Sequence, residues 1–148
     1  MARGFTLVET IVVLAIIGVL ATVSTPSLLS YWQSAAVEAG ARELAGVINL
    51  ARQLAISRRT LVCVDVASTH VQLRLGGCSG RQWTGPATDR NGVIRLADDQ
   101  TVWVSANAQV VFTPLGAATP SGSYTVTHAR TRESRAVVVA ASGRITIQ

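Results

Sequence analysis

The sequence predicts an α+β protein in which a long N-terminal helix packs on an antiparallel β-sheet domain. Three stretches of different periodicity lead to this fold class. An apolar run covers residues 5–23, a helical-period stripe follows within residues 27–59, and short β-branched segments fill the chain from Thr60 onward. A chain of 148 residues has room for one domain and an anchor.

The apolar run is long enough to cross a bilayer core of about 30 Å as a helix. We therefore expect a transmembrane helix over residues 5–25, with Arg3 on the cytoplasmic side. The alternative is a secretory signal peptide cut near residues 21–24. Glu9 is the single charged residue of the run and would lie in the hydrophobic region of such a peptide, where charges are avoided, so we favour retention.

Glu9 needs a physical explanation, because an unpaired carboxylate costs roughly 2.5–3.5 kcal/mol in the middle of a bilayer. We expect a cationic partner for it. The alternative is a tolerated acid near the membrane edge.

The outer half of the helix, residues 26–59, is predicted to be amphipathic. Its apolar residues recur at steps of four, three and four, and these are Leu44, Ile48, Ala51 and Ala55. Pro26 is expected to kink a continuous helix rather than end it, giving a rod of about 80 Å. The alternative is two helices joined at residues 24–26.

Residues 60–148 are predicted to form a β-rich domain, in which segments 101–105, 123–129 and 144–148 alternate as strands with one wet face do. Segment 135–141 is apolar without alternation, which predicts a central strand covered on both faces. The sheet and the helical stripe each need an apolar partner, so we expect them to pack together. The longest predicted loop covers residues 76–92.

The segment GFTLVE at residues 4–9, followed by an apolar run and a proline, resembles the start of type IV pilins and type II secretion pseudopilins. Further segments look like the GspH/FimT-type minor pilins: ARELAGVINLARQLAISRRTLVCV, VVFTPLGAA, SGSYTV and RAVVVAASGRI. The resemblance covers nearly the whole chain and implies a pilin-like fold.

The resemblance also implies a maturation route. Residues 1–4 would be a leader that a prepilin peptidase removes after Gly4, and Phe5 would become a methylated N-terminus. The new α-amine is cationic at neutral pH and lies four residues before Glu9, so it could pair with Glu9 of the same chain or of a neighbour. The family assigns Glu9 the second role, in filament assembly. A four-residue leader is short, which leaves a start codon upstream open.

The expected function is that of a minor pilin or pseudopilin in a type IV pilus or a type II secretion pseudopilus. Its expected partners are other pilin subunits, the prepilin peptidase and the bacterial inner membrane, with a single span and a periplasmic globular domain. The alternatives are a DNA-binding minor pilin for natural transformation and a single-pass anchored enzyme or sensor.

Catalysis and cofactor binding are not expected. The thirteen basic residues are all arginines, and without lysine the chain cannot form a Walker A phosphate loop or a Schiff base. The histidines and cysteines lack zinc-site spacing, and Asp98 and Asp99 are adjacent as in a turn. We therefore expect neither a metal nor a cofactor.

Cys63 and Cys78 are the two cysteines, and an even count in an exported domain favours a disulfide. A hairpin turning at residues 68–70 would place Cys63 opposite Arg74, about 13 Å along the chain from Cys78. The glycine pair before Cys78 could fold the chain back. The alternative is two buried thiols.

The C-terminal arginines are the remaining candidates for binding, namely Arg130, Arg132, Arg135 and Arg144. They could grip phosphates without reading sequence. Some family relatives resemble DNA receptors that use a G-R-x-R motif, but here Thr146 stands at the second arginine position. No aromatic residue interleaves these arginines, so we expect a solvated basic loop and keep DNA binding as the alternative.

Overall fold

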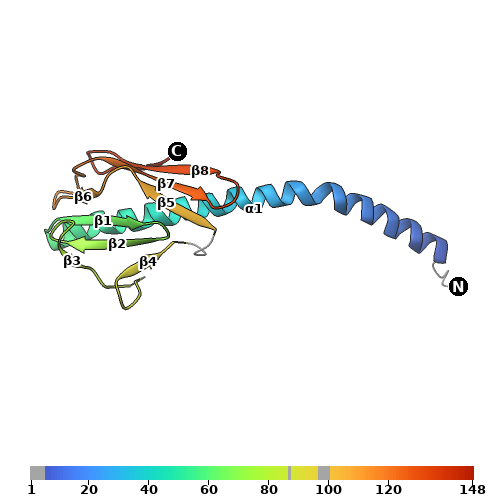
Figure 1. The fold of residues 1–148 in the computed structure, drawn as a ribbon, viewed down its shortest axis with the longest axis horizontal. Coiled ribbons are helices and arrows are strands. Elements are labelled where there is room, and N and C mark those ends of the chain that lie inside the picture. The colour runs from blue at the N-terminus through green and yellow to red at the C-terminus, as the bar shows by residue number, and fades with distance from the viewer. Residues whose placement is uncertain (1–5, 87, 97–100) are drawn as a thin grey trace. The chain divides into compact units, whose positions relative to one another are not determined.

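The computed structural model describes residues 6–86, 88–96 and 101–148, without the side chains of residues 23–30. The chain divides into two compact units, residues 1–34 and 35–148. Figure 1 gives the order of the elements along the chain.

Helix α1 (Leu7–Arg58) is a single α-helix of 52 residues, so the two separate helices considered above are not found. It begins after Thr6, whose hydroxyl accepts a hydrogen bond from the Glu9 backbone N–H at 3.3 Å. Its end is capped by Arg59 with a φ of 49°, and the Thr60 N–H donates to the Ala55 carbonyl at 3.2 Å, as in a Schellman motif. The kink expected at Pro26 stays a prediction, because nothing of that side chain is described.

The predicted helical stripe is confirmed, since Leu44, Ile48, Ala51 and Ala55 are all fully buried. Val37 and Ala41 extend the same face toward the N-terminus. This face packs on the β-strands within residues 35–148, as Figure 1 allows the reader to follow.

The strands form two antiparallel sheets rather than the one that we expected. The first has five strands in the order β3-β2-β1-β6, with β4 also paired to β2. Its strands are β1 (Val62–Ala67), β2 (His70–Leu75), β3 (Arg81–Gln82), β4 (Val93–Arg95) and β6 (Val110–Phe112). Strand β3 lies inside the predicted long loop 76–92, where two residues are too short a segment to leave an alternating pattern.

The second sheet has four strands in the order β5-β7-β8-β9. They are β5 (Val102–Ala106), β7 (Gly122–His128), β8 (Ser134–Val139) and β9 (Ile145–Ile147). Burial alternates along β7, as its sequence predicts.

Segment 135–141 was predicted to be a central strand covered on both faces; as β8, its central position is confirmed, but the covering of both faces is wrong. The strand is central, because it pairs with β7 on one side and β9 on the other. However, Val137 and Val139 are buried whereas Ala136 and Val138 are only partly so, and only one face of the strand packs on the core. The small apolar residues on its outer face hide the alternation in the sequence.

Both sheets turn their inner faces toward α1 and share one core. The first sheet contributes Val62, Val64, Val71, Leu73 and Phe112, and the second contributes Val102, Val104, Tyr124, Val126, Val137 and Val139. The outer face of the second sheet is therefore left without a layer from the described residues.

Candidate functional site

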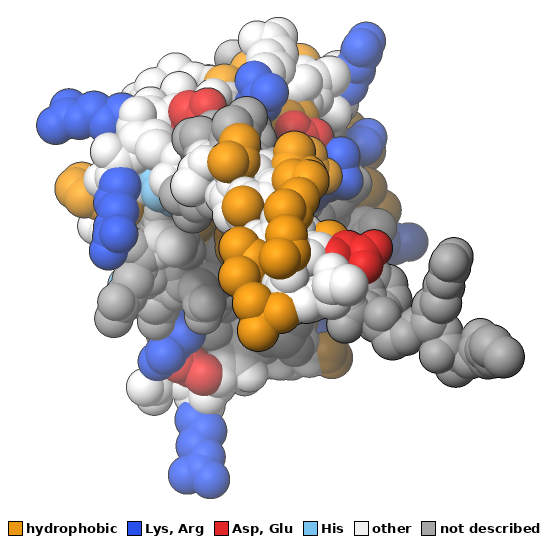
Figure 2. Space-filling view, turned by 90° about the vertical axis from the view of Figure 1, so that its right-hand side faces the viewer, with side chains coloured by type: hydrophobic (Ala, Val, Ile, Leu, Met, Phe, Trp, Pro, Cys, Tyr) orange, Lys and Arg blue, Asp and Glu red, His pale blue; other side chains and the backbone are white. Residues whose placement is uncertain are grey.

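The N-terminal part of α1 exposes an apolar surface. Every described side chain from Leu7 to Thr22 is exposed, including Leu7 at 76% and Leu14 at 62%. Figure 2 shows hydrophobic side chains gathered along the end of the helix that faces the viewer. A soluble helix would not leave such a surface uncovered, so this stretch needs lipid or protein around it. Gly4 and Phe5 lie outside the described residues.

Glu9 is the one charged residue of this surface among residues 6–22, and it is exposed. Thr6 and Glu9 also have the spacing of a capping box, in which an N-cap threonine binds the N3 backbone and an N3 glutamate binds the N-cap backbone. The first of these two hydrogen bonds is present. The sequence analysis did not predict this capping role of Glu9, although the T-x-x-E spacing is typical of a capping box. Glu9 thus has two candidate functions, helix capping and pairing with a cation.

Within the described part of the chain, no helix has a window long and apolar enough to cross a membrane. The described side chains of the apolar stretch end at residue 22. The span predicted for residues 5–25 therefore stays a prediction.

Cys63 and Cys78 form a disulfide with their Cα atoms 5.0 Å apart. The hairpin register places Cys63 opposite Arg74, as the sequence predicts. Gly76 and Gly77 then adopt φ values of 90° and 101°, which residues with a Cβ rarely reach, and this turn returns Cys78 to Cys63. The separation of about 13 Å expected for an extended chain therefore does not prevent the bridge.

The four candidate arginines do not form one patch. Arg135 lies on β8 and its guanidinium is 3.7 Å from the Glu38 carboxylate of α1. Arg144 precedes β9, at the opposite end of β8 from Arg130 and Arg132. The adjacency of these residues in the sequence is misleading, because a strand separates them and alternation turns them to different faces.

The turn between β7 and β8 carries Arg130 and Arg132. It is organised by His128, which is buried and whose Nδ1 accepts hydrogen bonds from the backbone N–H groups of Arg130 and Thr131, both at 3.2 Å. The Arg132 N–H donates to the His128 carbonyl at 3.2 Å, and Arg132 has a φ of 60°. A buried histidine therefore shapes the turn from inside the fold.

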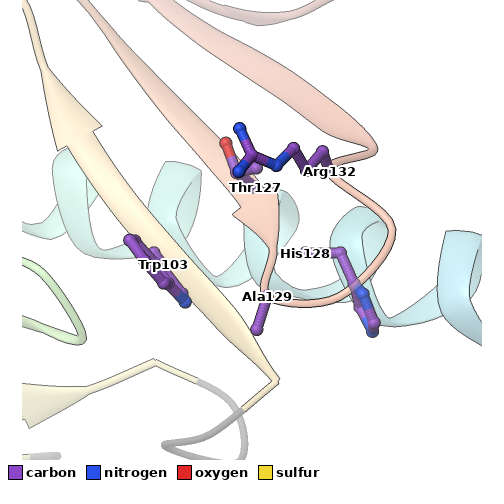
Figure 3. A pocket seen from close by; sticks show the side chains of 5 residues that line it. All are labelled: Trp103, Thr127, His128, Ala129 and Arg132. Carbon is purple, nitrogen blue, oxygen red and sulfur yellow. The ribbon is translucent and has the colours of Figure 1, made fainter.

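Beside this turn lies an aromatic residue that sequence reasoning missed. Trp103 on β5 is 60% exposed and pairs across the strands with Thr127 on β7. Trp103, Thr127, His128, Ala129 and Arg132 line a hollow of about 170 Å³. Figure 3 shows the Arg132 side chain next to Thr127, with Trp103 on the neighbouring strand. Trp103 lies beside this turn because of the register in which β5 pairs with β7, and the sequence alone does not indicate that register.

The described residues contain no group of three or more His, Cys, Asp or Glu side chains that could hold a metal ion. Asp98 and Asp99 lie outside them. His70 is partly buried on β2, and His128 serves the turn described above.

Two family models match the chain. The model for the type II transport protein GspH matches residues 40–143, and the prokaryotic N-terminal methylation motif matches residues 1–25. No curated protein sequence matches the chain at a significant level.

Solved structures share the fold. The solution structure of GspH from E. coli matches with a TM-score of 0.59 and 15% identity, over 77% of this chain and 88% of that one. The minor pseudopilin EpsH from the type 2 secretion system of Vibrio cholerae gives 0.58 and 13%, over 76% and 95%. The type IV minor pilin FimU of Pseudomonas aeruginosa gives 0.56 and 14%, over 76% and 87%.

These matches confirm the predicted pilin-like α+β fold and a structural, non-enzymatic role. The methylation motif implies a prepilin that is processed at the inner membrane. The chain belongs to the GspH family of type II transport proteins, and it is a minor pseudopilin or minor pilin that carries the N-terminal methylation motif.

Proposed function

We propose that a prepilin peptidase cuts the chain after Gly4, that Phe5 becomes the methylated N-terminus, and that Glu9 recruits the subunit into a filament with other pilins. The filament is a type IV pilus or a type II secretion pseudopilus. One observation carries the proposal: the exposed apolar surface of residues 7–22 holds a single carboxylate.

The charges of the mature terminus support this role. Cleavage would create an α-amine with an ordinary pKa near 8, one helical turn before Glu9. In lipid, each charge requires a partner, since the cost of an unpaired ion exceeds that of a paired one. An amine that pairs with Glu9 of the neighbouring subunit satisfies both charges and sets the register between two helices.

The proposed location is the inner membrane, with one span over residues 5–25 and the globular domain in the periplasm. Arg3 before the apolar run favours a cytoplasmic N-terminus. The disulfide between Cys63 and Cys78 suits the oxidising periplasm. In the filament, the same apolar surface would pack against other subunits.

Glu9 substitutions separate assembly from helix capping. Glutamine also serves at the N3 position of a capping box, so Glu9→Gln keeps the cap and removes the charge, whereas Glu9→Ala removes both. Thr10→Val changes the next residue and is the matched control. Each variant is expressed in the native host, and the subunit is quantified in sheared or cross-linked filaments and in the membrane fraction.

The proposal expects Glu9→Gln and Glu9→Ala to reach the membrane in normal amounts but to be depleted from filaments at least about tenfold, a loss of about 1.4 kcal/mol. Thr10→Val should assemble normally. If Glu9→Gln assembles as the wild type does, Glu9 acts through its cap and the assembly role is wrong.

A further inference from the structure

The end of the globular unit at which α1 terminates carries an exposed leucine on a tight turn. Strand β6 leads into residues 113–116, the leucine turn, in which the Gly116 N–H donates to the Thr113 carbonyl at 2.8 Å. Figure 1 shows β6 and the end of α1 at this same end. Leu115 is 91% exposed, more than any other large hydrophobic side chain of the described residues. A single exposed leucine is common on proteins, so its surroundings decide what it means.

The leucine turn is held in place by its neighbours. The Nε group of Arg52 on α1 donates to the Gly116 carbonyl at 3.1 Å. The backbone of Gly143 lies so close to the same carbonyl that a Cβ would collide with it. A Cβ at Gly116 would lie 2.9 Å from the Cδ1 atom of Ile56, which is itself 46% exposed. Leu115 is therefore presented by a fixed backbone beside a second apolar side chain, and a preorganised group loses little entropy when it binds.

The charge around the leucine turn has one sign. Residues 49–62, 111–121 and 139–148 meet here, since Arg52 and Gly143 contact Gly116 and the Ala118 N–H donates to the Ala141 carbonyl at 3.0 Å. These three segments contain four arginines and neither aspartate nor glutamate. Three of the arginines are exposed and make no ion pair with a described residue: Arg58, Arg59 and Arg144.

The adjacent aspartates of segment 97–100 are undescribed, but the residues that flank them lie at the other end of the sheets. The Leu96 N–H donates to the Thr69 carbonyl in the turn after β1, and the Thr101 carbonyl accepts a hydrogen bond from the β7–β8 turn. The leucine turn adjoins the opposite end of β1, where Val62 pairs with β6. The strand between these two ends is about 17 Å long.

We propose that Leu115, together with Ile56, inserts into an apolar pocket on a different pilin subunit, and that the exposed arginines around it pair with carboxylates bordering that pocket. Apolar anchors inside a polar, charged rim are the usual organisation of a protein–protein interface. This inference rests on the proposed filament function, which brings other subunits into contact with the chain, and it names the surface that binds one of them.

The charges favour a different subunit over a second copy of this chain. The described carboxylates of residues 35–148 already have interactions within the chain. Glu38 and Asp65 pair with arginines, Asp89 accepts two backbone N–H groups, and Glu43 and Glu133 have further contacts. The formal net charge of +5 also makes two copies repel each other. A partner with acidic residues around an apolar pocket meets neither obstacle.

An anionic lipid surface would also attract arginines, but the apolar area here is small for it. Attachment to lipid requires either a broad apolar face or a second anchoring signal. Leu115 and the half-exposed Ile56 provide two side chains on a rigid surface. A shaped protein pocket makes better use of them than a fluid membrane does.

The first experiment identifies the partner in the native host. The full chain carries the photo-crosslinking residue p-benzoylphenylalanine in place of Ser57, which is exposed next to Ile56, or in place of Thr131 in the β7–β8 turn as a control. We expect position 57 to link to a different protein that has an N-terminal methylation motif, through a peptide that contains Asp or Glu. Leu115→Ala should reduce this product at least about tenfold, and position 131 should not give it.

The second experiment measures binding of the purified full chain, in neutral detergent, to the subunit identified by the crosslink. Leu115→Ala should raise the dissociation rate at least about tenfold, and Leu115→Met should restore most of the affinity. The double variant Arg58→Gln/Arg59→Gln should slow association and flatten its salt dependence. Arg90→Gln/Arg130→Gln removes two charges from exposed loops elsewhere and should change neither rate.

Several results would overturn the proposal. They are a crosslink from position 57 to a second copy or to a protein without the methylation motif, no crosslink there, an unchanged dissociation rate for Leu115→Ala, and equal effects of the two arginine double variants. Leu115-dependent binding to vesicles containing phosphatidylglycerol would assign the surface to lipid instead. The filament function is tested separately, because the Glu9 variants and the mass of the mature N-terminus do not involve Leu115.

Discussion

Gly143 and Gly46 have opposite surroundings. Gly143 adopts a φ of 77°, and a Cβ there would collide with the Gly116 carbonyl oxygen, close to the Arg52 side chain that binds the same oxygen. Gly46 lies on the exposed side of α1, and a Cβ there would meet nothing within 4 Å. One glycine is required by the fold, and the other weakens a helix.

We therefore predict that Gly143→Ala lowers the free energy of unfolding by at least about 2 kcal/mol. Gly46→Ala should raise it by about 0.5–1 kcal/mol, because alanine loses less backbone entropy in a helix. Denaturant titration of both variants in detergent checks the pair. If both substitutions changed the free energy of unfolding in the same direction, the opposite roles of Gly143 and Gly46 would be contradicted.

Tyr124 gives the fold a dependence on alkaline pH. The side chain is fully buried, and its hydroxyl accepts a hydrogen bond from the Val110 N–H at 3.4 Å. Burial raises the pKa of Tyr124 to about 12, because the phenolate loses its hydration. The folded state therefore resists ionisation that the unfolded state undergoes near pH 10.

Because of this difference in pKa, the free energy of unfolding falls as the pH rises above about 10. The stabilisation is complete below pH 10 and is lost between pH 10 and 12, by up to about 2–3 kcal/mol for a shift of about two pH units. Unfolding measured against pH should show this loss in the wild type and much less of it in Tyr124→Phe. In a Tyr31→Phe background, the ultraviolet absorbance of the tyrosinate reports Tyr124 directly; titration near pH 10 would contradict its burial.

At the residue scale, the sequence does not show which residues of neighbouring strands lie opposite one another, and this limited the predicted sites. It found Glu9 as a lone carboxylate in an apolar run but missed the hydrogen bond to Thr6. It grouped four arginines by proximity in the chain, and it missed Trp103, which joins Arg132 only through the pairing of β5 with β7.

The β1–β2 hairpin is the element whose stability depends most on a covalent link. The disulfide from Cys63 closes a loop with a sequence separation of 15, worth roughly 3 kcal/mol in the chain-entropy model. Replacing both cysteines with alanine should cost the domain about this amount. Reductant should lower the unfolding midpoint of the wild type and not that of the variant. Equal midpoints for wild type and variant would contradict this role of the bridge.

The buried face of α1 is the second element that mutation can test. Leu44 is fully buried in the core shared by both sheets, whereas Asn49 is exposed on the same helix. Leu44→Ala should destabilise the protein by about 2–5 kcal/mol through lost burial and a cavity, and Asn49→Ala should change stability by less than about 0.5 kcal/mol. A small loss for Leu44→Ala in denaturant unfolding would mean that the helix face contributes little to the core.

Elements in which apolar residues recur at a regular spacing were predictable from the sequence, and very short elements were not. The helical stripe and the pairing of Cys63 with Arg74 follow from local pattern and turn position. The two-residue strand β3 leaves no period to read. The outer face of β8 carries Ala136 and Val138, so its sequence imitates a strand that is buried on both sides.

For the whole molecule, the fold class was predictable because three periodicities follow one another along the chain. The division into two sheets was not, since the strands of both sheets alternate alike and only tertiary pairing assigns them. The family follows from residues 40–143, most of which form the globular domain, whereas the proposed filament role depends on the N-terminal segment that carries the methylation motif.

The central claim, that the chain matures into a filament subunit, is tested most directly by mass spectrometry of the protein purified from its native membranes. We predict a mature chain that begins at Phe5 and carries one N-terminal methyl group. A chain that retains Met1, or one that begins beyond residue 23, would contradict the account.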